Sequence, residues 1–313
     1  MIRGIHHLTL VVRDTDAAVQ YYAAAGGLHC QSSEGAVALA LSLHQVAGAD
    51  AHFTPVLLAG PNGYLLLAGI GGPKAQTTDA NPINRVGIRH LCVQNHDCAI
   101  LNAGVYRGGG SLIAPPVDLG TGNQYAYARD VEANIMEIEG LPYAPADEPT
   151  WLAHVALVTR NLDQTCAFYQ GLFETQLKRR AKVGPGAQFD RMGGLRETVL
   201  EGAWLPAGNL QLELWQFHQP PSPDEPRPRT VLDPGYSMMS LECDDLERDV
   251  ARLIDLGGIR IRTLAESNLA RAAVCADPEG NLVELIEFKT AGRTWAIAAR
   301  PDPDFVGRVE AGR

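Results

Sequence analysis

The sequence predicts an α+β protein built from four copies of one βαβββ unit. The main observation is an internal repeat with a constant offset of 147 residues. It aligns His7 with His154, Asp14 with Asn161, Asp16 with Asp163, and Tyr22 with Tyr169. The second and fourth quarters also resemble each other, since Asp130 recurs as Asp277. A length of 313 residues suits two domains of about 150 residues each, so each domain would hold two units.

Each unit is expected to open with a strand, continue with a helix and close with three short strands. Residues 87–93 show the alternation of apolar and polar side chains that is typical of an opening strand. Every predicted helix begins at an Asp or Asn, which can cap a helix N-terminus. Turn residues separate the closing strands. The predicted helices cover residues 14–25, 97–106, 161–173 and 245–256.

Segments rich in Pro and Gly separate the units and indicate their limits. The four predicted units comprise residues 4–72, 86–141, 151–218 and 235–289. The first two would form an N-terminal domain, residues 1–142, and the last two a C-terminal domain, residues 150–289. Residues 290–313 lie outside the repeat, and we expect them to form a tail on the surface.

Composition excludes several classes of protein. A formal charge of -10 disfavours nucleic acid as a partner, because binding it requires a basic surface. No apolar run reaches the roughly 18–20 residues that a membrane helix needs, and the N-terminus lacks the features of a secretory signal. The six cysteines form no metal-binding or disulfide pattern. We therefore expect a cytoplasmic protein with a small-molecule substrate, and a homodimer is left open.

The four opening strands share one chemical pattern. One face of each strand is apolar throughout and is expected to pack on the helix. The other face begins with His7, His90 and His154 in units one to three, and with Met238 in unit four. A small residue follows two places later and leaves space in front of the ring. A cavity wall needs such space, whereas a packed core fills it.

The closing strands add carboxylates to this pattern. Glu137, Glu213 and Glu284 end units two, three and four, whereas unit one has Leu66 at that place. A charged residue among apolar neighbours is costly unless it is paired or bound to a metal. Glu139 and Glu287 are expected to end their strands in solvent. The candidate metal ligands are therefore His7, His90, Glu137, His154, Glu213 and Glu284.

The strand histidines, the Phe168-Tyr169 helix and the segment from Asp277 to Glu284, which reads DPEGNLVE, resemble the vicinal oxygen chelate superfamily. This superfamily includes glyoxalase I, bleomycin resistance proteins, methylmalonyl-CoA epimerase and extradiol ring-cleaving dioxygenases. The resemblance covers about residues 4–289. It implies two glyoxalase-like half-barrels, each made of two units that curl around a divalent metal ion. Each unit would supply at most one opening-strand histidine and one closing-strand Glu or Gln.

The set of ligands that meet depends on which units pair. If neighbours pair, units one and two combine His7, His90 and Glu137, which suits Fe(II) or Mn(II). If units two and three pair, His90, Glu137, His154 and Glu213 form a four-ligand site, and His7 and Glu284 are left as a remnant. We favour neighbour pairing, and His90 and Glu137 belong to a metal site in both arrangements. The metal is left open among Fe, Mn, Zn, Ni and Co.

The resemblance implies a metal-dependent enzyme for a small organic substrate with adjacent oxygen atoms. Lyase, isomerase or epimerase chemistry is favoured, with Glu137 or Glu213 moving a proton. Ring cleavage by an extradiol dioxygenase is the alternative. Tyr127 fits the closing motif of such enzymes and would be catalytic, but residues 118–124 contain no acid/base histidine. A second alternative is a protein that sequesters a ligand without catalysis.

Two further patterns have simpler interpretations. Residues 178–182, which read KRRAK, could attract a phosphate, but we interpret them as a solvated strand end. The aromatic pairs Tyr21-Tyr22 and Phe168-Tyr169 are expected to face the hydrophobic core from their helices.

Overall fold

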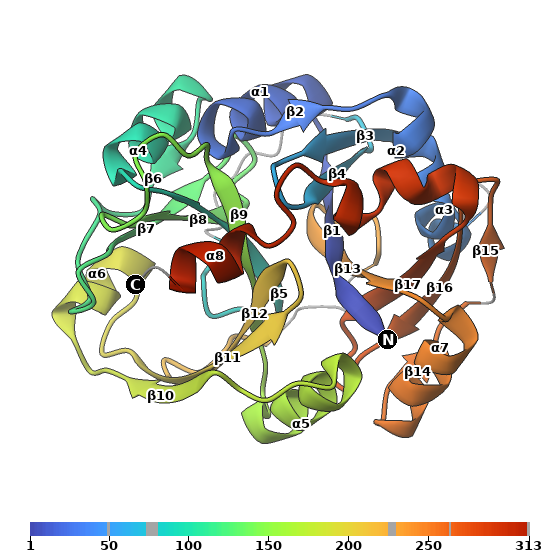
Figure 1. Cartoon of the computed structure of the whole chain (residues 1–313). Helices are drawn as coiled ribbons and strands as arrows, with labels where there is room; N and C mark the ends of the chain where they lie inside the picture. Colours follow the sequence, from blue (N-terminus) through green and yellow to red (C-terminus); the bar gives the residue numbers. More distant parts are fainter. Residues whose placement is uncertain (49–50, 73–80, 225–229, 263, 312–313) are drawn as a thin grey trace.

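The structure, a computed structural model, describes residues 1–48, 51–72, 81–224, 230–262 and 264–311. Figure 1 shows two curved sheets that stand side by side, with helices along their outer edges. Within the described residues, one sheet has nine strands and the other has eight. The α+β class and the four βαβββ units are confirmed.

Units one and three carry extra helices between their second and third strands, two in unit one and one in unit three. Unit one consists of β1 (Ile2–Val12), α1 (Thr15–Gly26), β2 (His29–Cys30), α2 (Ser33–Leu39), α3 (Leu41–Ala47), β3 (Thr54–Ala59) and β4 (Tyr64–Gly69). Unit three consists of β9 (Trp151–Val158), α5 (Leu162–Phe173), β10 (Arg179–Val183), α6 (Ala187–Gly193), β11 (Val199–Ala207) and β12 (Leu210–Gln219).

Units two and four lack these extra helices. Unit two consists of β5 (Gly87–Asn95), α4 (Cys98–Arg107), β6 (Ser111–Leu112), β7 (Gln124–Arg129) and β8 (Ile135–Gly140). Unit four consists of β13 (Gly235–Cys243), α7 (Leu246–Asp255), β14 (Ile259–Arg260), β15 (Ala265–Glu266), β16 (Ala270–Ala276) and β17 (Leu282–Phe288). The helices α1, α4, α5 and α7 begin after Asp14, Asp97, Asn161 and Asp245, whose side chains accept a backbone N–H of the first turn as predicted.

The expectation that neighbouring units pair is wrong. Strand β5 of unit two pairs with β9 of unit three, and β1 of unit one pairs with β13 of unit four. The connections explain this arrangement. Residues 141–150 form the shortest link between units and carry the chain directly from β8 to β9 in the same sheet. The longer links, residues 70–86 and 220–234, lead from one sheet to the other. The boundary between residues 142 and 150 therefore separates sequence repeats, and each sheet contains strands from both halves.

Neighbouring units nevertheless dock through their helices. Helix α1 packs against α4, and α5 packs against α7. The hydroxyl of Tyr22 donates a hydrogen bond of 3.1 Å to Asp130 of the next unit. Its repeat partner Tyr169 donates one of 2.9 Å to Asp277. The repeated Tyr and Asp positions thus have a structural role.

One hydrophobic core joins the two sheets to these helices. The apolar faces of all four opening strands contribute to it, including Leu8, Leu91, Val155 and Met239. The helix aromatic pairs are buried in the same core, as predicted. The opposite faces of the strands are left to line the concave side of each sheet.

The C-terminal segment crosses from one sheet to the other. It contains two short 3-10 helices, η1 (Thr290–Trp295) and η2 (Ile297–Ala299), followed by α8 (Phe305–Ala311). The backbone N–H of Ile297 donates a hydrogen bond of 2.6 Å to Glu242 on β13 of the nine-stranded sheet. Phe305 then stacks on Trp151 of β9, with ring centroids 4.5 Å apart. Figure 1 shows α8 in red beside the eight-stranded sheet. Among the described helices, none is long and apolar enough to cross a membrane.

Candidate metal centre

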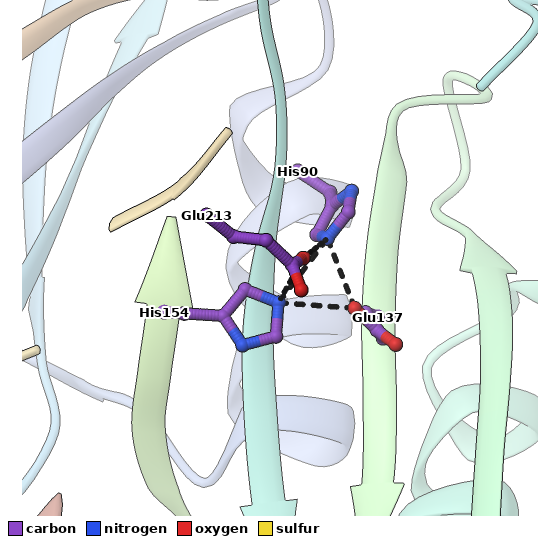
Figure 2. Close-up of side chains that lie close together, drawn as sticks. All are labelled: His90, Glu137, His154 and Glu213. Atoms are coloured by element: carbon purple, nitrogen blue, oxygen red, sulfur yellow. Dashed lines mark hydrogen bonds and ion pairs between the residues drawn. The ribbon is translucent and has the colours of Figure 1, made fainter. Parts of the chain in front are cut away.

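Four predicted ligands converge on the concave face of the eight-stranded sheet (Figure 2). They come from its four central strands, whose order is β12-β9-β5-β8. The antiparallel pairing of β5 and β9 sets His90 opposite Ala156 and His154 opposite Cys92. The parallel pairs on either side set Glu137 beside Cys92 and Glu213 beside Ala156. Each predicted small residue therefore leaves space for the histidine of one strand and the carboxylate of another.

The four side chains are His90, Glu137, His154 and Glu213, and their nearest atoms lie within 4.8 Å of one another. Glu137 Oε2 is 3.0 Å from the Nε2 atoms of both histidines. Glu213 Oε2 is 3.2 Å from His154 Nε2 and 3.8 Å from His90 Nε2. The two Nε2 atoms are 3.3 Å apart. All four groups therefore aim at one common point.

Burial makes the electrostatics of this cluster strong. Burial alone raises the pKa of Glu137, but hydrogen bonds from both histidines outweigh it and lower the pKa to about 2. For His154, burial alone lowers the pKa, and the facing acidic groups raise it well above its ordinary value. The acidic groups that carry a negative charge here are Glu213 and Glu137, because burial raises the pKa of the facing Cys92 thiol and keeps it protonated. The two carboxylates thus stabilise a positive charge at this point.

The donor set fits a divalent metal ion. Two neutral imidazoles and two carboxylates balance a charge of two, and mixed nitrogen and oxygen donors suit Zn, Mn, Fe, Ni or Co. Glu213 Oε2 is buried and has no hydrogen-bond partner among the described residues, despite its distance to His154. A buried carboxylate oxygen without a partner is costly, and a metal ion would provide that partner.

The cluster lies at the base of a cavity of about 440 Å³. Aromatic side chains form much of its wall, including Tyr125, Tyr127, Trp204 and Trp215. The ring of Tyr127 lies 5.2 Å from that of His90, measured between centroids. Burial raises the pKa of the Tyr127 hydroxyl well above its usual range. Tyr127 is therefore a proton donor, and it would be a poor base at neutral pH.

The expectation that Glu139 ends its strand in solvent is wrong. Its side chain is buried and lines the same cavity as Glu137, two residues earlier on β8. Gln94 and Asn123 donate hydrogen bonds to its two carboxylate oxygens. Burial and the charge of Glu137 raise the pKa of Glu139 to about 6. The alternation that identified Glu137 also applied to Glu139, but the loop residue Asn123 that encloses it could not be foreseen. By contrast, Glu287 is only half-buried and pairs with Arg271 at 2.6 Å.

The two remaining predicted ligands, His7 and Glu284, lie in the other sheet and belong to a hydrogen-bonded chain. Ser240 bridges them, with its Oγ 3.0 Å from His7 Nε2 and within hydrogen-bond distance of Glu284. Ser42 donates to the other oxygen of Glu284. Every side chain in this chain is buried. Within the described residues, these groups do not form a cluster of three metal-ligating side chains.

The far end of this chain fixes the direction of its hydrogen bonds. His6 Nε2 lies 2.8 Å from the carbonyl oxygen of Trp295 and must donate to it. Burial lowers the pKa values of both His6 and His7, so both rings are neutral. His6 Nδ1 then accepts from His7 Nδ1 at 2.8 Å, and His7 Nε2 accepts from Ser240. With the Ser240 proton used, Glu284 must donate to Ser240 as a carboxylic acid.

Helices α2 and α3 fill the space in front of this chain. Leu39 of α2 packs with Leu66, the residue that replaces the unit-one carboxylate. Leu43 of α3 packs with Val11 and Met238, and Met238 occupies the unit-four histidine position. The nine-stranded sheet therefore has an apolar filling where the eight-stranded sheet has its cavity.

Comparisons with known proteins agree with this architecture. Residues 151–285 match the model of the Glyoxalase/Bleomycin resistance protein/Dioxygenase superfamily. Glyoxalase I from Zea mays aligns over 99% of this chain and 96% of its own, with 17% identity and a TM-score of 0.62. A putative dioxygenase from Bacillus subtilis subsp. subtilis str. 168 aligns over 100% and 96%, with 12% identity and a TM-score of 0.59. No curated protein matches the chain significantly.

The match places residues 151–285 in the glyoxalase/bleomycin resistance protein/dioxygenase superfamily. The fold of the described residues is similar to that of glyoxalase I from Zea mays. At these identities the structural likeness establishes the fold alone. The family resemblance predicted from the sequence is thus confirmed, whereas the reaction has to be argued from the site.

Proposed function

We propose that the protein is a metal-dependent enzyme with one divalent ion held by His90, Glu137, His154 and Glu213. The observation that carries this proposal is the convergence of these four buried side chains on one point. The substrate would be a small organic molecule with two adjacent oxygen atoms, and the reaction a lyase, isomerase or epimerase reaction. A bound divalent ion would polarise the substrate oxygens and stabilise negative charge that develops on them.

Glu213 is the better candidate for moving a proton between adjacent atoms of the substrate. Glu137 is held by both histidines at 3.0 Å. Glu213 Oε2 lies farther from them, at 3.2 and 3.8 Å, and makes no hydrogen bond among the described residues. A carboxylate that can leave its place is a more effective base than one that is fixed. Tyr127 would donate a hydrogen bond within the cavity, because its hydroxyl keeps its proton.

Metal content tests this proposal and separates an enzyme of this kind from a ligand-sequestering protein that needs no metal. We would measure bound divalent metal in the purified protein and in His90→Ala and Glu137→Ala. Both variants should lose most of the metal, with affinity lowered by more than about 10-fold. His7→Ala is the matched control, because it removes the equivalent histidine of the other sheet and should leave the metal content unchanged. Unchanged occupancy in both His90→Ala and Glu137→Ala would reject the site.

Extradiol ring cleavage is the second candidate, and Tyr127 beside His90 is the observation that favours it. Among the described residues that line the cavity, His154 is the only histidine, so an additional acid/base histidine for catechol protons has no candidate there. We expect weak or no oxygen uptake with simple catechols after anaerobic loading with Fe(II). Rapid stoichiometric uptake with a yellow ring-opened product would promote ring cleavage over proton transfer.

A further inference from the structure

Strand β10 separates the basic cluster predicted at residues 178–182 into two groups. Arg179 and Val183, which lie on one face of the strand, line the cavity of the metal centre. Arg180 lies on the opposite face, where it pairs with Asp163 at 2.6 Å and with Glu201 at 2.7 Å. Arg180 fits the interpretation of the cluster as a solvated strand end, and Arg179 is exposed as well but lies at the cavity.

A row of side chains leads across the sheet from the metal centre to Arg179. Glu213 of β12 is opposite Trp204 of β11, and Trp204 is opposite Arg179 of β10. Neighbouring strands are about 4.8 Å apart, so two strand spacings, roughly 10 Å, separate Glu213 from Arg179. The cavity covers the whole row.

Aromatic rings line the middle of this row. The Arg179 guanidinium lies 5.0 Å from the centroid of the Trp204 ring, which holds the cation at the cavity wall. Trp204 meets Trp215 edge to face at 5.6 Å, and Trp215 lies 6.0 Å from Phe189. These rings offer a planar apolar body a stacking surface.

The charges at the cavity mouth leave one cation available. Lys178 also lines the cavity, but it pairs with Glu310 of α8 at 2.5 Å. Within the described part of the chain, Arg179 makes no ion pair with a carboxylate, and its recorded contact is the Trp204 ring. Arg179 is therefore free to bind one anionic group of a ligand.

We propose that the cavity binds an aryl acid, with two adjacent oxygen atoms at the metal centre, a planar ring on Trp204 and a single anionic group at Arg179. This inference rests on the proposed function and adds the substrate class to it. The strand spacing sets the scale of the substrate, because the backbone positions of Glu213 and Arg179 are two strand spacings, roughly 10 Å, apart.

Three bidentate probes separate the parts of this subsite. Acetohydroxamate offers only two adjacent oxygens, benzohydroxamate adds a ring, and 4-carboxybenzohydroxamate adds an anionic group at the far end. We would measure their dissociation constants by titration calorimetry with the Zn(II)-loaded protein. The ring and the carboxylate should each tighten binding, by roughly fivefold for the ring and roughly fivefold for the carboxylate.

Variants assign each gain to its residue. Arg179→Gln should abolish the gain from the carboxylate alone, and Trp204→Leu should reduce the gain from the ring. Arg180→Gln is the matched control, because it removes the neighbouring cation from the outer face of the same strand, and it should keep all three affinities. Acetohydroxamate binding in each variant shows that the metal centre is intact.

The outcomes separate this inference from the proposed function. If acetohydroxamate binds but the ring and the carboxylate add nothing, the aryl-acid subsite is wrong and the metal centre stands. The same holds if Arg179→Gln and Arg180→Gln have equal effects. If Zn(II) does not load or acetohydroxamate does not bind, both the metal centre and the subsite are wrong.

Discussion

At the candidate metal centre, His154 lies between two carboxylates, 3.0 Å from Glu137 and 3.2 Å from Glu213. These charges raise the pKa of His154 well above its ordinary value despite burial. Without a metal ion, the imidazole therefore carries a proton at neutral pH. A metal ion needs the neutral ring as its ligand, so the ion and the proton compete for the same position.

This competition predicts that metal binding releases protons. We expect about one proton to be released per divalent ion at pH 7, and the apparent affinity to fall about tenfold for each unit of decreasing pH. Titration calorimetry in two buffers with different ionisation enthalpies would measure the released protons. Affinity that does not change between pH 6 and pH 8 would show that His154 does not exchange a proton for the metal.

Glu284 offers a second test at the scale of single residues. Burial raises its pKa to about 7, above the ordinary value of about 4.3 in an unfolded chain. The folded state therefore binds the proton more tightly, and its stabilisation is complete at pH values below the unfolded pKa. It is lost progressively as the pH rises from about 4.3 through about 7.

Glu284→Gln should remove this pH dependence, because an amide can donate to Ser240 and accept from Ser42 as the carboxylic acid does. The variant should match the wild type at about pH 4, below the unfolded pKa, and exceed its free energy of unfolding at pH 8. Urea denaturation at the two pH values measures the difference, and Glu284→Ala, which leaves a cavity, should be less stable at both. A Glu284→Gln variant that is destabilised equally at both pH values would contradict a neutral Glu284.

At the scale of elements, the extra helices decide what each concave face can do. Helices α2 and α3 place Leu39 and Leu43 against the strands of the nine-stranded sheet. Helix α6 places Phe189 and Met192 at the wall of the other sheet and leaves the cavity open. The same insertion point in the repeat thus produces a filled face in one sheet and a binding cavity in the other.

Leu43→Ala should therefore behave as a core substitution. Leu43 is fully buried, and loss of its side chain should lower the free energy of unfolding by about 2–5 kcal/mol. Val37→Ala on α2 is the control, since Val37 is 56% exposed and should change stability by less than about 0.5 kcal/mol. Chemical denaturation of both variants provides the comparison. A Leu43→Ala variant as stable as Val37→Ala would mean that α3 does not fill the sheet.

At the scale of the whole molecule, the repeat predicts the four units, and the structure shows which units pair. The four opening strands have the same apolar face, so side-chain patterns could not distinguish β5 pairing with β9 from β5 pairing with β1. The choice depends on the connections, of which residues 141–150 are the shortest. The offset of 147 residues therefore predicts the four units, but it does not predict which units pair to form each sheet.

Part of the candidate site could also be predicted from the sequence, and part could not. His90 and Glu137 could be predicted under either pairing, because each occupies a repeated strand position. Glu139 could not, because its burial depends on the loop that carries Asn123. The contribution of residues 290–311 was also not foreseen, since this segment has no repeat partner. It brings Val306 and Glu310 of α8 to the cavity mouth.

The proposed function requires that one of the two half-barrels holds a metal ion and that the other does not. A crystal structure of the metal-loaded protein, with anomalous diffraction recorded at the absorption edge of the bound metal, tests it directly. We predict one anomalous peak per chain, surrounded by His90, Glu137, His154 and Glu213, and none between His7 and Glu284. A peak at His7 and Glu284, or no peak at the four-residue site of a loaded crystal, would contradict the account.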